Sequence, residues 1–131
     1  MGLDMYLKGE KFFTTYEGYK RRIEDGFEVS EHSLEIGYWR KHPDLHGYIV
    51  NTFNKGIDNC KPINLNPDNF IDIINAIKED RLPKTTGFFF GTSENDEQEK
   101  QEAIEIFEKA FNWLVKEQKG CWKSVIYQAS W

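Results

Sequence analysis

Both ends of the chain alternate apolar and polar residues with a period of two. Leu3, Met5 and Leu7 alternate with polar or charged neighbours near the N-terminus, and residues 122–131 repeat the pattern at the C-terminus. This spacing is typical of strands with one buried face. Because chain ends fray unless they are paired, we expect the first strand, near residues 2–8, to lie beside the last strand in one sheet.

The segments between these ends predict one more strand and three helices. Residues 33–39 alternate like a strand. Pro43 begins a helix of about residues 43–54, and a second helix begins after Asn66 and ends before Pro83. The longest helix is predicted near residues 95–118, and residues 9–30 have only a weak pattern that allows a mobile excursion or a short helix from Tyr16 to Ile23. Residues 1–131 should therefore form a single α+β domain, with a mainly antiparallel sheet and about three helices packed on it.

Composition excludes several classes of protein. The 131-residue chain has no apolar run near 18 residues and no signal pattern, so we expect neither a membrane span nor secretion. The net charge of −5, with the acids clustered from Glu94 to Glu108, argues against a nucleic-acid surface. A basic protein partner would suit this run better than DNA, but the favoured interpretation is that the run is the solvated face of a helix. Cys60 and Cys121 lack CxxC spacing and are expected to be reduced thiols in or near the core.

Three adjacent Phe residues between two glycines, in the run Thr85–Ser93, predict a short buried strand that leads into a polar loop and a helix start. Such loops bind anions readily. The cluster Trp39–Arg40–Lys41 adds a ring for stacking and two cations. The candidate ligand-binding residues are Asp4, Tyr6, Trp39, Arg40, Lys41, Thr86, Gly91, Thr92 and Ser93, with Thr85 beside them, and a nucleotide-like ligand would suit them. The alternative is that Trp39 belongs to the core, Arg40 and Lys41 to the surface, and Thr92 and Ser93 to a helix cap.

Catalytic and metal-binding patterns are weak. The three histidines, His32, His42 and His46, are expected to be surface or half-buried residues, and neither a metal nor a cofactor is expected. Cys60 with a histidine, or Asp4, is the candidate for a small hydrolase, although an acid on a first strand is more often a partner for Arg, here Arg40.

Five segments resemble a family of small phage and prophage proteins that has no assigned activity: Met1–Leu7 (MGLDMYL), Gly37–Lys41 (GYWRK), Asp58–Cys60 (DNC), Thr86–Gly91 (TGFFFG) and Tyr127–Trp131 (YQASW). The resemblance spans the whole chain. It implies an accessory protein made by a phage or integrated element in the cytoplasm of a bacterial host.

Three functions remain open at this point. The first is a non-enzymatic inhibitor that binds a host protein, such as a defence protein, and the second is a sponge for a small nucleotide-like ligand. The third is a small hydrolase that uses Cys60 or Asp4. A protein inhibitor should show an exposed aromatic or apolar patch, whereas a sponge should show a pocket.

Overall fold

A computed structural model of the chain describes residues 2–13, 22–87 and 89–131. In chain order its elements are β1 (Asp4–Phe13), β2 (Ile23–Glu24), β3 (Phe27–Glu28), β4 (Glu31–Arg40), α1 (Pro43–Phe53), β5 (Ile63–Leu65), α2 (Pro67–Lys78), α3 (Glu97–Val115) and β6 (Cys121–Ser130). Strands β1, β4, β5 and β6 form one antiparallel sheet in the order β4-β1-β6-β5, and β2 and β3 form a small hairpin.

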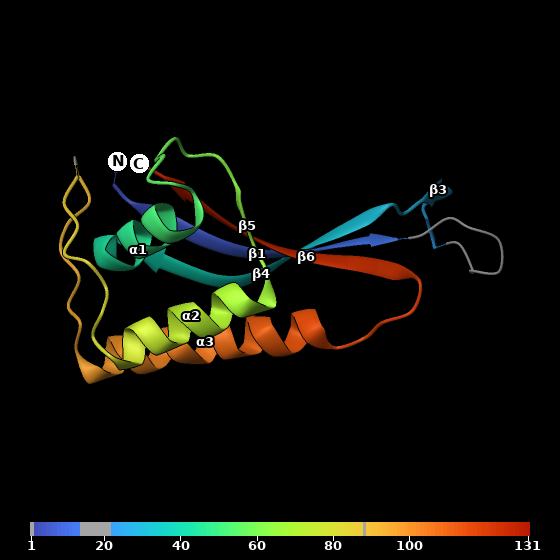
Figure 1. Cartoon of the computed structure of the whole chain (residues 1–131). Coiled ribbons are helices and arrows are strands. Elements are labelled where there is room, and N and C mark those ends of the chain that lie inside the picture. The colour runs from blue at the N-terminus through green and yellow to red at the C-terminus, as the bar shows by residue number, and fades with distance from the viewer. Residues whose placement is uncertain (1, 14–21, 88) are drawn as a thin grey trace.

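The first and last strands are neighbours, as the alternation predicts. Met5 lies opposite Ala129 in the register of β1 and β6, and the pairing continues along the whole of β1 to Phe13 and Cys121. Figure 1 shows both chain termini at the same end of the sheet, beside α1, while α2 and α3 run side by side. The α+β class, the mainly antiparallel sheet and the three helices are confirmed.

The core lies between one face of the sheet and the helices. Met5, Leu7 and Tyr127 point from the strands toward this side and are fully buried. Trp39 on β4 stacks on Phe107 of α3, with ring centroids 5.3 Å apart. This aromatic pair joins the sheet to α3, while most of the other buried hydrophobic residues are aliphatic.

The helices begin at residues that the sequence indicates. Asn66 caps α2, since its side chain accepts from the N–H of Asn69 and the Asn69 side chain accepts in return from the N–H of Asn66. The cap of α3 is Asp96, whose carboxylate accepts from the N–H of Glu99 at 2.8 Å, and not Ser93. The last helix is therefore shorter at both ends than the predicted range of residues 95–118.

The predicted strand around the three Phe residues is wrong. Residues 81–87 and 89–96 have no regular structure, and Phe88 lies outside the described residues. Phe89 and Gly91 have φ values of 63° and 74°, which lie in the left-handed region and are incompatible with a strand. Only Phe90 of the described rings in this run is buried.

One short element was predicted from the sequence and another was not. The helix allowed from Tyr16 to Ile23 falls largely on residues 14–21, which lie outside the described residues, and Ile23 itself begins β2. The three-residue strand β5 was not predicted, because a segment as short as Ile63–Leu65 gives only one alternation. No helix among the described residues has the length and apolar character that crossing a membrane requires.

Deletion of residues 129–131 tests the pairing of the chain ends. The deletion removes the buried Ala129 and the indole of Trp131, which donates to Asp58, and it leaves the end of β1 without one of its two neighbours. We expect the free energy of unfolding in urea to fall by at least about 2 kcal/mol. As a matched control, Trp122→Ala at the other end of β6, where the ring is 74% exposed, should change it by less than about 0.5 kcal/mol. An unchanged urea midpoint after the deletion would contradict the account.

Candidate functional site

Segments far apart in the sequence meet at the end of the sheet that carries the chain termini. The N–H of Lys41 donates to the carbonyl of Leu3 at 2.8 Å. A Cβ placed on Gly91 would lie 3.0 Å from the Cβ of Lys41, so the backbone of the loop packs directly on this side chain. Its φ of 74° and this close approach favour glycine at position 91. We call the surface formed here by Gly2, Arg40, Lys41, Phe89, Gly91 and Trp131 the terminal rim.

The rim combines cations with exposed aromatic rings. Arg40 and Lys41 are exposed, and a Cβ on Gly2 would lie 3.7 Å from Nη2 of Arg40 and from the carbonyl oxygen of Phe89. Phe89 is 50% exposed and Trp131 is 47% exposed. Three of the predicted site residues, Arg40, Lys41 and Gly91, therefore lie together with the backbone of Phe89, and Trp131 joins this loop through its contact with Phe90.

Two other predicted residues, Asp4 and Tyr6, lie next to the rim on the open face of the sheet. Asp4 is opposite Arg40 in the register of β1 and β4, but within the described residues no ion pair joins them. The Asp4 carboxylate instead accepts from the hydroxyl of Tyr38 at 2.5 Å, and this hydrogen bond is the main reason that the pKa of Tyr38 is raised. The ring of Tyr6 lies 5.3 Å from that of Tyr38.

The remaining predicted residues lie elsewhere. Trp39 is buried on the helix-facing side of β4, so it cannot contact the same ligand as Tyr6. Thr86 and Thr92 are exposed on the loop, and Thr85 donates its N–H to Asp44 at 3.0 Å. Ser93 faces the start of α1, where its Oγ lies 2.7 Å from Nδ1 of His42.

A chain of hydrogen bonds holds Trp131 in the rim. Its indole N–H donates to Oδ1 of Asp58 at 3.1 Å, and Oδ2 of Asp58 lies 2.9 Å from Nε2 of His46. Nδ1 of His46 lies 2.6 Å from the hydroxyl of Tyr127. A carboxylate only accepts, so Nε2 of His46 carries the proton and Nδ1 accepts from Tyr127. Phe90 adds an edge contact to the Trp131 ring, with centroids 6.0 Å apart.

The burial of two histidines contradicts the expectation that they lie at or near the surface. His46 is 2% exposed and His42 is 4% exposed. His42 is the N-cap of α1 and His46 lies in its first turn, and each ring nitrogen of both residues has a partner on another segment. Periodicity alone cannot show this, because their partners are 12 to 81 residues away in the sequence.

Asp44 fixes the loop that carries Phe89 and Gly91. Its carboxylate accepts from the N–H of Thr85 at 3.0 Å and from the side-chain amide of Asn95 at 2.9 Å. The N–H of Asp44 in turn donates to Oγ of Ser93 at 3.0 Å. A Cβ on Gly47 would lie 2.0 Å from Oγ1 of Thr85. Only glycine at position 47 of α1 therefore leaves room for the loop. These contacts fix the loop at Thr85, before Phe89 and Gly91, and at Ser93 and Asn95, after them.

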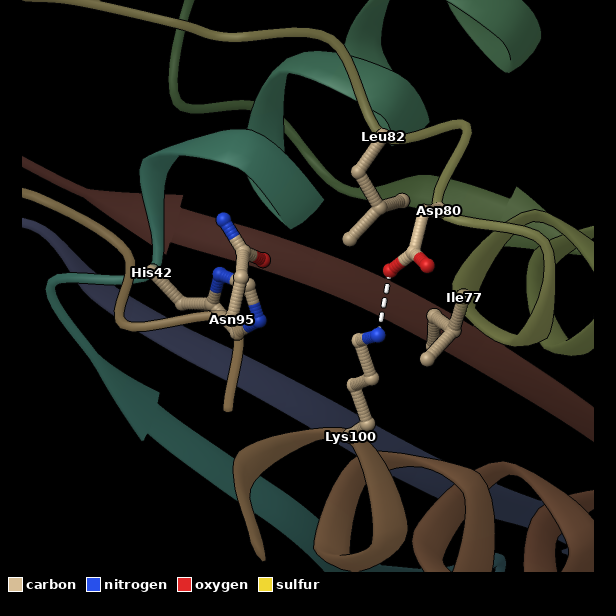
Figure 2. A pocket seen from close by; sticks show the side chains of 6 residues that line it. All are labelled: His42, Ile77, Asp80, Leu82, Asn95 and Lys100. Carbon is tan, nitrogen blue, oxygen red and sulfur yellow. Dashed lines mark ion pairs between the residues drawn. The ribbon is translucent and has the colours of Figure 1, made fainter. Parts of the chain in front are cut away.

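A pocket of about 230 Å³ lies behind this loop, between α1, α2 and α3. Figure 2 shows its side chains and the ion pair between Asp80 and Lys100 that spans one side. Its lining residues are His42, Ile77, Asp80, Leu82, Asn95 and Lys100. This volume is smaller than that of typical sites for drug-sized ligands, about 300–1,000 Å³.

Among residues 2–13, 22–87 and 89–131, no group of three or more His, Cys, Asp or Glu side chains is arranged to hold a metal ion. Comparison with protein-family models, curated proteins and solved structures finds no match to this chain. The candidate site is therefore argued from its geometry.

The buried Tyr127 predicts a loss of stability in alkali. Burial, followed by the nearby Asp58, raises the pKa of Tyr127 well above 10.0. The unfolded chain ionises this tyrosine near pH 10 while the folded chain does not, so the stabilisation is complete below that pH and is lost as the pH rises toward the folded pKa.

In urea titrations between about pH 9.5 and 11, the unfolding free energy of Tyr127→Phe should therefore fall less steeply than that of the unmodified protein. The difference can reach about 1.4 kcal/mol per pH unit, the value for one proton. Parallel slopes for the two proteins would show that Tyr127 ionises equally in both states.

Proposed function

We propose that the protein inhibits a protein of a bacterial host by binding it through the terminal rim, and that this inhibition involves no catalysis. The observation that supports this best is the grouping of Arg40 and Lys41 with the exposed rings of Phe89 and Trp131, with Tyr38 beside them. Trp, Tyr and Arg are the residues most enriched among the energetic anchors of protein interfaces. The host context is suggested by the five phage-like sequence segments, four of which contribute residues to the rim while the fifth contributes Asp58, which holds Trp131.

The rim is organised before it meets a partner. Trp131 is held by Asp58 and Phe90, and the side-chain carbons of the exposed Lys41 lie close to Gly2 and Gly91. Side chains that are fixed in the free protein lose less conformational entropy on binding. The two exposed cations favour a partner surface that presents acidic groups next to apolar ones.

The geometry gives less support to the other two functions. A nucleotide sponge needs a concave site, typically of about 300–1,000 Å³. The pocket at His42 and Lys100 has about 230 Å³ and the pocket at Tyr6 and Tyr38 about 260 Å³, and Arg40, Lys41 and Gly91 line neither of them. For a hydrolase based on Cys60, the nearest histidine across the small cavity is His46. Both ring nitrogens of His46 are occupied, by Tyr127 and Asp58, so neither can take a proton from Cys60.

Variants of Arg40 test the rim. The partner would be captured from a bacterial lysate, purified, and titrated by calorimetry against wild type, Arg40→Ala and Arg40→Lys. We expect Arg40→Ala to weaken binding by at least about 30-fold, the effect of an interface anchor worth about 2 kcal/mol. Arg40→Lys should also weaken it, because an ammonium cannot reproduce the planar fork of the guanidinium.

Lys109→Ala is the matched control, since it removes the same charge from an exposed position of α3, away from the rim. Its affinity should stay within about twofold of wild type. Capture of a lysate protein counts only if this pattern is found. Equal binding by Arg40→Ala and wild type would place the interface elsewhere.

A further inference from the structure

Ser93, His42 and Glu99 lie in line at the start of α1. Oγ of Ser93 is 2.7 Å from Nδ1 of His42, and Nε2 of His42 is 3.2 Å from Oε1 of Glu99. The three residues come from the loop before α3, from the N-cap of α1 and from the first turn of α3. A hydroxyl, an imidazole and a carboxylate in this order form the arrangement by which a serine is activated as a nucleophile, whatever the sequence order.

The hydrogen bonds around the three residues fix the position of each proton. Oε1 of Glu99 also accepts from the N–H of Asn95 at 2.8 Å, so this oxygen acts as an acceptor and Nε2 of His42 carries the ring proton. Oγ of Ser93 accepts from the N–H of Asp44 at 3.0 Å, which leaves the hydroxyl proton of Ser93 to point at Nδ1 of His42. The unprotonated nitrogen of the ring therefore faces the serine.

The surroundings favour the charges that such a reaction creates. Burial lowers the pKa of His42, against the opposing influence of Glu99 and Asp44, so the ring is neutral and able to accept a proton at neutral pH. Oγ of Ser93 sits at the N-terminus of the 11-residue helix α1, bonded to its N–H at Asp44. The positive end of the helix dipole stabilises negative charge on that oxygen.

His42 connects this group to the pocket in Figure 2, although Ser93 and Glu99 are not among the lining residues. His42 and Asn95 lie on one side of it, and the apolar side chains of Ile77 and Leu82 lie on the other together with the ion pair of Asp80 and Lys100. Its volume of about 230 Å³ has room for roughly seven groups the size of a water molecule. A short acyl chain matches this size and the apolar side chains, whereas a long chain does not.

We propose that Ser93, His42 and Glu99 form an acyl-transfer site that acts on short-chain esters, separate from the terminal rim. Oγ of Ser93 attacks the ester carbonyl carbon and its proton passes to Nδ1 of His42. The bond to the leaving alcohol breaks and the alcohol takes that proton. A water molecule then attacks the acyl group on Ser93 in the same way, releasing the carboxylic acid and restoring the serine. Glu99 positions the ring and stabilises its positive charge.

A small fluorophosphonate ester tests the site on the unmodified protein. Oγ of Ser93 should form a bond to phosphorus while the bond to fluorine breaks, and the proton should pass to His42. Intact-mass measurement and peptide mapping should find one adduct, on Ser93, that does not form in the urea-unfolded chain. No adduct on Ser93 in the folded protein, or the same adduct on unfolded chain, would overturn the proposal.

Variants then distinguish a Ser93 hydroxyl that is activated by its neighbours from one that is merely exposed to the reagent. Thr92→Ala, the matched control, removes an exposed hydroxyl next to Ser93 and should leave the labelling rate unchanged. Glu99→Gln keeps a side-chain acceptor for the Asn95 N–H but cannot stabilise a charged ring, so labelling should slow by about 10²-fold, the lower range for loss of acid–base assistance. With Glu99→Gln folded, as its thermal melt reports, an unchanged rate would also overturn the proposal.

Discussion

The pairing of the first strand with the last is the interaction on which the rest of the structure depends. β1 lies between β4 and β6, and every residue from Asp4 to Phe13 has a partner on β6. This register brings the N-terminus, the end of β4 and the C-terminus to one end of the sheet. Arg40, Asp4 and Ser130 lie in one row across the three strands, on the order of 10 Å from end to end. The terminal rim is a direct consequence of that row.

α1 completes the arrangement because its first turns carry polar side chains into the core. His42 and Asp44 bind the loop before α3, while His46 binds the loop after α1 and the last strand. Buried polar groups are stable only when they are paired, and here the pairing fixes three segments at once. One helix N-terminus thereby holds Trp131 on one side and Ser93 on the other.

The fold was largely predictable from the sequence, and the site only in part. Period-two alternation and Pro at helix starts give the long strands and helices correctly, since these signals are local. The same rule places Trp39 on the face opposite Arg40 and Tyr38, and it would have excluded Trp39 from the site and included Tyr38. The loop from 85 to 93 is different. Its Phe residues have a high propensity for strands, but tertiary contacts override that propensity because Phe90 packs on His46 and Trp131. The links from Asp58 to His46 and Trp131 have no sequence signal at all.

Hydrogen exchange of the protein alone and bound to its captured partner tests the central claim most directly. The account predicts that protection on binding is concentrated in the amides near residues 2–5, 38–41, 89–92 and 129–131, which form or adjoin the rim, with little change at residues 22–33 and 119–124 at the far end of the sheet. Protection confined to the far end, or spread evenly along the chain, would contradict binding through the terminal rim.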